Sequence, residues 1–130
     1  MRSATTSISI DCHPKRVYDF VSTPRNLPKW ATAFCKSIQP SKGEWLIKTQ
    51  KGQTMNVRFV KKNTLGVIDH FVSPEPGITI FVPMRVVPNG KGSEMLFTLF
   101  QMPGMTNQSY AADLKLVKKD LRTLKKVLEK

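Results

Sequence analysis

The sequence has few cysteines and no spacing of them that suggests a cross-link or a metal site. Cys12 and Cys35 form neither a CxxC pair nor a Cys/His cluster of the zinc-binding kind, so we expect no metal. A chain of 130 residues can bury a core without disulfides, and we interpret both thiols as reduced. If the first two strands paired antiparallel, both cysteines would lie at one end of that pair, where a disulfide is geometrically conceivable.

Long hydrophobic runs and the common catalytic motifs are also missing. No apolar segment approaches the roughly 18 residues of a membrane-spanning helix, so we expect no membrane span. The first residues, MRSATT, lack the apolar segment of a secretory signal, and a cytoplasmic location is the expectation. GxSxG, the P-loop, HExxH and GxGxxG are all absent, which excludes the enzyme classes they identify. We therefore expect no cofactor.

Acidic residues are scarce: nine Asp and Glu stand against 21 Lys and Arg, a formal net charge of +12. A basic domain attracts nucleic acids and anionic surfaces through sequence-independent electrostatics. The basic residues are nevertheless scattered along the chain, without stacking aromatic side chains among them and without a recognisable nucleic-acid-binding motif. This pattern favours a solvated basic surface over a nucleic-acid-binding one.

The strongest pattern in the chain is its last segment, Met105–Lys130. Apolar residues recur there at alternating steps of four and three, with lysines and arginines between them, as in an amphipathic helix. Thr106 or Asn107 can cap the first turn. The stripe consists of Tyr110, Leu114, Val117, Leu121, Leu124 and Leu128. A stripe of this length must be buried, either against the rest of the chain or, in a homodimeric coiled coil, against a second copy.

Most of the preceding chain has the alternation and turn signals of β-strands. A first strand, Ala4–Asp11, is followed by two short helices, Pro14–Val21 and Pro24–Trp30. Six further strands are expected at Phe34–Gln39, Glu44–Thr49, Thr54–Lys61, Gly66–Val72, Ile78–Val87 and Glu94–Met102. Pro83 lies inside one of them, and we expect a bulge or an unpaired edge there.

This order of elements predicts one α+β domain over residues 1–130. Consecutive strands with short connections form an antiparallel meander, here a sheet of seven strands that twists and curves. The long C-terminal helix would pack on the concave face of that sheet. Unless side chains fill it, the space between helix and sheet is a natural site for an apolar ligand.

Four segments of the chain resemble a known family. Two are SISIDCHPKRVYDFVSTPRNLPKW at Ser7–Trp30 and FTLFQMPGMTNQSYAADLKLVKKDLRTLKKVLE at Phe97–Glu129. The others are GVIDHF at Gly66–Phe71 and VPMRVVPNGKGSE at Val82–Glu94. Together they make the chain similar to the START-like, or SRPBCC, superfamily with its helix-grip fold, and more narrowly to its small polyketide cyclase/dehydrase-like members. The resemblance implies a cavity between helix and sheet that holds a hydrophobic molecule, and it supplies no catalytic motif that carries over residue by residue.

His70 is the titratable residue best suited to acid–base chemistry near neutral pH. It lies within a predicted strand next to Asp69, and neighbours in a strand point to opposite faces. Only one of the two can therefore face a cavity, and the sequence leaves open which. The alternative for His70 is a half-exposed histidine without a function.

Arg85 is a third catalytic candidate, because an inward guanidinium would bind a carboxylate or enolate of a ligand. Its alternate neighbours look like the core-facing residues of the strand. This favours an outward Arg85 that pairs with an acid such as Asp69 or Glu94.

Large side chains from the helices and strands would shape the cavity; for each one singly plain core is the favoured explanation, but a few should border any cavity. They are Trp30, Trp45, Met55, Phe59, Tyr110, Leu114, Val117 and Leu121. We expect this chain, as a monomer or a homodimer, to bind a small hydrophobic molecule, aromatic or polyketide- or lipid-like. The alternatives are a polyketide cyclase or dehydratase that uses His70, Asp69 or Arg85, and a protein or nucleic-acid interaction module that uses the basic surface.

Overall fold

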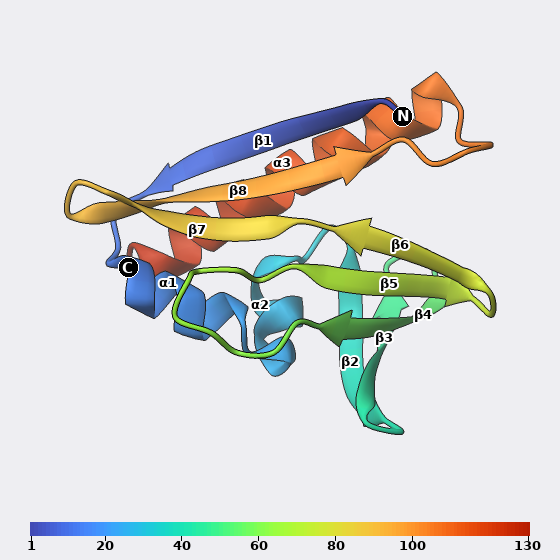
Figure 1. Cartoon of the computed structure of the whole chain (residues 1–130), viewed down its shortest axis with the longest axis horizontal. Helices are drawn as coiled ribbons and strands as arrows, with labels where there is room; N and C mark the ends of the chain where they lie inside the picture. Colours follow the sequence, from blue (N-terminus) through green and yellow to red (C-terminus); the bar gives the residue numbers. More distant parts are fainter.

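The computed structural model describes residues 1–130, which form two antiparallel sheets and three α-helices (Figure 1). The elements follow one another as β1 (Ser3–Ile10), α1 (Pro14–Val21), the 3₁₀-helix η1 (Pro24–Asn26), α2 (Leu27–Trp30), β2 (Cys35–Ser41), β3 (Glu44–Thr49), β4 (Thr54–Phe59), β5 (His70–Glu75), β6 (Ile78–Val82), β7 (Met84–Asn89), β8 (Gly92–Phe100) and α3 (Asn107–Leu128). Strands β2 to β6 form a five-stranded meander, and β1, β8 and β7 form a three-stranded sheet in that order. The predicted α+β architecture with a long C-terminal helix is confirmed.

The number of strands differs from the prediction, because Pro83 divides one of them. The segment predicted as a single strand over Ile78–Val87 becomes β6 and β7, which belong to different sheets. Proline has no N–H to donate to a ladder, so regular pairing stops there. Its carbonyl oxygen still accepts a hydrogen bond from the N–H of Thr98 at 3.0 Å, which keeps the junction beside β8. The molecule therefore has eight strands in two sheets instead of seven in one.

The strand predicted over Gly66–Val72 begins later than expected, at His70. The side chain of Asn63 organises a turn before it: its Oδ1 accepts hydrogen bonds from two following backbone N–H groups, at 2.9 and 3.2 Å. Gly66 has a φ of +75°, and a Cβ at this position would overlap the carbonyl oxygen of Val86. This turn takes the place of the first half of the predicted strand.

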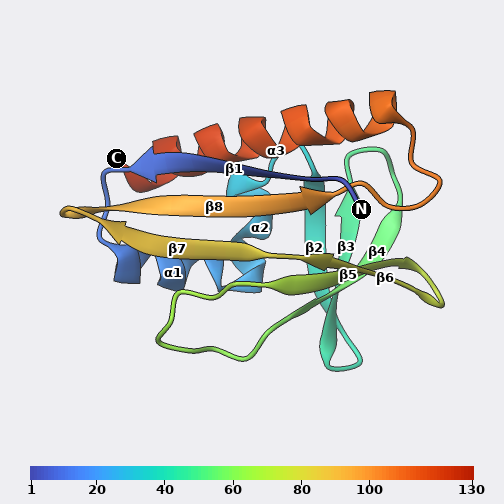
Figure 2. The ribbon, with the colours of Figure 1, turned by 45° about the horizontal axis from the view of Figure 1, so that its top comes forward.

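Helix α3 lies along the three-stranded sheet, as Figure 2 shows. It begins at the predicted cap, where the Thr106 Oγ1 accepts a hydrogen bond from the N–H of Ser109 at 3.0 Å. The buried members of its apolar stripe, Tyr110, Leu121, Leu124 and Leu128, face inward where the helix packs against β1, β8 and α2. The stripe is thus buried within the chain and is not available for the coiled-coil alternative. No helix in the structure is both long enough and apolar enough to cross a bilayer.

The basic residues of α3 face the solvent: Lys115, Lys118, Lys119, Arg122 and Lys126 are exposed.

Cys12 and Cys35 are both buried and free. The arrangement that would have brought them together is wrong, because β1 pairs with β8 and not with β2. Burial raises the pKa of the Cys35 thiol to about 11, which suppresses the reactive thiolate.

Asp69 and Arg85, two of the three catalytic candidates, form an ion pair that supports the junction of the sheets. The Arg85 Nη2 lies 2.9 Å from the Asp69 Oδ2, and Arg85 points outward, as its alternation favoured. Asp69 is buried, and its Oδ1 accepts a hydrogen bond from the backbone N–H of Met84 at 2.9 Å, directly after the break at Pro83. Both residues lie outside the wall of the cavity described below, and the contacts they make here are structural.

Two replacements of Asp69 should distinguish the contribution of its ion pair with Arg85 from that of its hydrogen bond with the N–H of Met84. Asp69→Ala should lower the free energy of unfolding by about 2 kcal/mol, because it leaves the buried N–H of Met84 without an acceptor. Asp69→Asn keeps an acceptor oxygen at the same position and should lose only about half as much, since the guanidinium of Arg85 is largely exposed. Urea denaturation of both variants beside the wild type measures the difference. Equal losses would show that the ion pair, not the backbone hydrogen bond, stabilises the junction.

Candidate functional site

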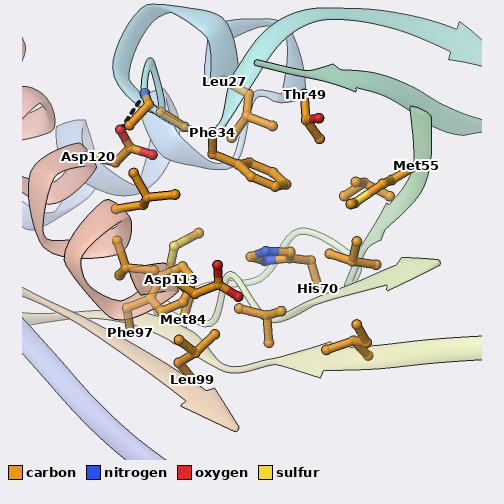
Figure 3. A pocket seen from close by; sticks show the side chains of 18 of the residues that line it. Leu27, Phe34, Thr49, Met55, His70, Met84, Phe97, Leu99, Asp113 and Asp120 are labelled. Atoms are coloured by element: carbon orange, nitrogen blue, oxygen red, sulfur yellow. Dashed lines mark hydrogen bonds between the residues drawn. The ribbon is translucent and has the colours of Figure 1, made fainter. Parts of the chain in front are cut away.

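A cavity of about 460 Å³ lies between α3, α2 and the sheets (Figure 3). Side chains from α2, from each of the strands β3 to β8 and from α3 line it, so the wall draws on both sheets. Of its 25 lining residues 17 are hydrophobic, which makes the interior predominantly apolar. Small-molecule sites in proteins commonly enclose about 300–1,000 Å³, and this cavity lies in that range.

Five of the eight predicted lining residues are in this wall: Trp30, Met55, Phe59, Val117 and Leu121. The prediction for Trp45 is wrong. Trp45 shares a face of β3 with Thr49, a lining residue, but it lies at the first end of the strand, toward the β2–β3 turn. There the guanidinium of Arg25 lies over its ring, 5.3 Å from the centroid.

The predictions for Tyr110 and Leu114 are also wrong, because α3 presents a neighbouring face to the cavity. Tyr110 is buried, and its hydroxyl donates a hydrogen bond to the carbonyl oxygen of Leu99 at 2.7 Å, which fastens α3 to β8. The cavity face of α3 consists of Ser109, Asp113, Leu116, Val117, Asp120 and Leu121. In the first half of α3 this cavity face precedes the apolar stripe by one residue, which corresponds to a rotation of about 100° around the helix. The cavity face and the stripe share only Val117 and Leu121.

Asp113 and Asp120 are lining residues that the sequence analysis missed. They are the only acids within α3 and stand seven residues apart, which places them on one side of the helix. That spacing, beside an apolar stripe and among lysines, is the signal that would have identified them. Asp120 is only 5% exposed, and its Oδ1 accepts a hydrogen bond from the N–H of Ala33 at 2.8 Å (Figure 3).

The two carboxyl groups differ in how the protein compensates their burial. Burial raises the pKa of both Asp113 and Asp120. For Asp120 the backbone N–H groups of Ala33 and Phe34 work against this rise. Asp113 forms no hydrogen bond or ion pair with the protein, and only the more distant charge of Lys51 counters the rise in its pKa. Of the two carboxyl groups, Asp113 is therefore the one without a hydrogen-bond donor from the protein.

His70 faces the cavity from the start of β5, which settles the choice between it and Asp69 (Figure 3). Its Nδ1 lies 3.2 Å from the carbonyl oxygen of Ile68, and because a carbonyl only accepts, Nδ1 carries the proton. Nε2 therefore has a free lone pair. The ring centroid lies 5.1 Å from that of Phe59 and 6.4 Å from that of Phe97. Burial lowers the pKa of His70, so the imidazole is neutral at neutral pH.

The exposed lining residues mark the entrance of the cavity. They are Gln50, Lys51, Gln53 and Ser109. The first three lie at the β3–β4 turn and the last in the first turn of α3, two segments that approach each other in Figure 2. A ligand would enter between them. Inside, one neutral base and two carboxyl groups can orient a ligand or transfer protons, and no group of three His, Cys, Asp or Glu residues is arranged to hold a metal ion.

Solved structures with the same fold support the architecture. Protein XoxI from Bacillus cereus superposes with a TM-score of 0.81 at 17% identity, over 98% of this chain and 96% of that one. The Aha1 dimer from Colwellia psychrerythraea gives 0.76 at 15% identity, over 99% and 97%. The di-domain ARO/CYC protein BexL of the BE-7585A biosynthetic pathway gives 0.63 at 16% identity, over 99% of this chain and 50% of that one. At these identities the likeness shows the fold alone.

Sequence comparison gives the family more directly. No curated protein matches the chain in sequence. The sequence model of one family, however, matches residues 1–129, nearly the full length. Its description is "Polyketide cyclase / dehydrase and lipid transport". With the two-sheet fold and the long C-terminal helix already in place, this match shows that the chain belongs to the polyketide cyclase/dehydrase and lipid transport family.

Proposed function

We propose that this protein binds a small hydrophobic molecule in the cavity between α3 and the sheets. The observation that supports this most strongly is an interior volume of about 460 Å³ with 17 hydrophobic residues among its 25 lining residues. A ligand that hides about 300 Å² of apolar surface there gains about 7 kcal/mol, before the cost of its lost translational and rotational freedom. The few inward polar groups would then select its orientation.

The comparisons support the same class of ligand. The family description names two activities, the cyclisation or dehydration of polyketides and the transport of lipids. Both involve a largely apolar molecule, and BexL, which shares the fold, is described as a di-domain ARO/CYC protein of the BE-7585A biosynthetic pathway. A carrier and an enzyme of this family would thus use the same interior.

A second function, a cyclase- or dehydratase-type reaction, is favoured by the position of His70. Its free Nε2 faces the cavity from β5, and the carboxyl group of Asp113 points into the same space from α3 (Figure 3). In a dehydration, Nε2 would accept a proton from the carbon next to a carbonyl group. The imidazolium would return it to the departing hydroxyl, which leaves as water. An ionised Asp113 would stabilise the imidazolium between the two steps.

Filling the cavity should abolish ligand binding. Val117→Trp places an indole in the lining of α3, whereas Val127→Trp makes the same change at a half-buried position of α3 outside the lining. The neutral dye N-phenyl-1-naphthylamine, which fluoresces in apolar surroundings, should bind the wild type and Val127→Trp saturably. It should bind Val117→Trp at least about tenfold more weakly, a loss of about 1.4 kcal/mol. Equal affinities for the two variants would place the dye elsewhere.

The imidazole of His70 should titrate below the value of about 6.5 of an unperturbed histidine, because burial disfavours its charged form. The ¹H–¹³C signal of its Cε1–H, assigned by its disappearance in His70→Gln, reports the midpoint. Saturation with N-phenyl-1-naphthylamine should lower the midpoint further, since an apolar ligand displaces water from the cavity. A midpoint at or above 6.5, or no response to a dye that binds, would contradict a position of His70 in the wall.

A further inference from the structure

The charge of the cavity is opposite to the charge of the protein. The chain has 21 basic and nine acidic residues, yet the lining contains two of the acids and one of the bases. The acids are Asp113 and Asp120, on the inner side of α3, and the base is Lys51, which is exposed at the entrance. A basic surface therefore surrounds an acidic interior, which is the reverse of what the composition alone would produce.

Most of the inward polar groups are acceptors of hydrogen bonds; the exception is the Nε1–H of Trp30, a donor that is buried without a partner. The carboxyl group of Asp113 has no partner in the protein, and that of Asp120 is occupied only by backbone N–H groups. His70 offers the lone pair of Nε2, because its Nδ1–H is engaged with the carbonyl oxygen of Ile68. The side chains that both donate and accept, Thr49, Gln50, Gln53 and Ser109, belong to the β3–β4 segment and the start of α3. A ligand that supplies a hydrogen-bond donor would satisfy the free acceptors of Asp113 and His70.

Aromatic rings stand beside these acceptors. Phe34, Phe59 and Phe97 line the same space as Asp113. An ammonium group is attracted both by the face of an aromatic ring and by a desolvated carboxylate. A carboxylate ligand would instead bring a negative charge toward Asp113 and Asp120, with only Lys51 at the entrance to compensate it.

From this combination we propose that the preferred ligand is an amphiphilic amine: a protonated amino group on an aromatic or similarly apolar body. The amino group binds Asp113, and the apolar body lies among the phenylalanines and the residues of the five-stranded sheet. This inference rests on the proposed ligand-binding function and names its chemical class.

Three compounds with the same naphthyl body and different head groups test the proposal: 2-naphthylethylamine, 2-naphthylethanol and 2-naphthylacetate. Calorimetric titration of the wild type at pH 7 should give an affinity for the amine about tenfold above that for the alcohol, with the acetate weakest. Because the alcohol has the same apolar body and an uncharged hydrogen-bonding group, the ratio of amine to alcohol affinity isolates the contribution of the charge. This comparison needs no variant.

Two variants with the same change of net charge locate the effect. Asp113→Asn should bring the ratio of amine to alcohol affinity close to one. Asp11→Asn, at an exposed residue outside the lining, should leave the ratio at its wild-type value. Lys51→Gln removes the positive charge that acts on Asp113 and should raise the ratio.

The ratio should also fall as the pH is lowered. Asp113 and Asp120 then lose their negative charge, beginning above the ordinary range of an aspartate because burial raises their pKa, while His70 gains a positive charge and Lys51 keeps its own. Binding of the alcohol with no preference for the amine, or equal effects of Asp113→Asn and Asp11→Asn, would overturn this inference alone. Failure of all three compounds to bind the folded protein would overturn the binding function as well.

Discussion

The missing N–H of Pro83 is the constraint on which the rest of the structure depends. Strand β6 ends there, and the chain passes from the five-stranded sheet to the three-stranded one. The N–H of the next residue, Met84, donates a hydrogen bond to the carboxylate of Asp69. Helix α3 is fastened to the second of these sheets through its apolar stripe and the hydroxyl of Tyr110. The neighbouring face of α3, with Asp113 and Asp120, lines the cavity together with residues of the five-stranded sheet.

That arrangement places ionisable groups where a plain core would hold none. Asp113, Asp120 and His70 all have a pKa shifted toward the neutral form by burial, which means that each disfavours the folded state when it is charged. Asp120 is partly compensated by backbone N–H groups, but Asp113 has no partner within the protein. Groups of this kind occur preferentially at functional sites, where a ligand or substrate supplies the missing interaction. The two proposed functions, ligand carrier and dehydratase-type enzyme, would use the same groups; the enzyme would in addition transfer a proton between His70 and the bound molecule.

Patterns that depend on local physics could be predicted from the sequence. The helix cap at Thr106, strand β3 and the apolar stripe of α3 follow from side-chain capping, turn residues and periodicity within a short segment. The α+β order followed from the sum of such patterns. Pro83 was recognised as a disturbance of pairing, but whether it produces a bulge or separates two sheets depends on which strands lie beside it.

The composition of the site could be predicted only in part, for a similar reason. Tyr110 and Leu114 were assigned to the cavity because hydrophobicity identifies the face of a helix that packs, and the face toward the cavity is rotated from it. Asp113 and Asp120 were missed because they lie beside the apolar stripe and do not belong to it. The choice between Asp69 and His70 required the register of β5 against β4, a pairing that the periodicity of the sequence does not record.

The most direct test of a ligand-binding cavity uses the methionines of the chain. Met55 and Met84 line the cavity, Met95 is fully buried outside its lining, and Met1, Met102 and Met105 lie elsewhere. In a protein labelled with ¹³C at the methionine methyl groups, titration with N-phenyl-1-naphthylamine should shift the signals of Met55 and Met84 while those of the other four stay in place. Saturable binding that shifts only the signals of Met1, Met102 or Met105, with Met55 and Met84 unchanged, would contradict the account.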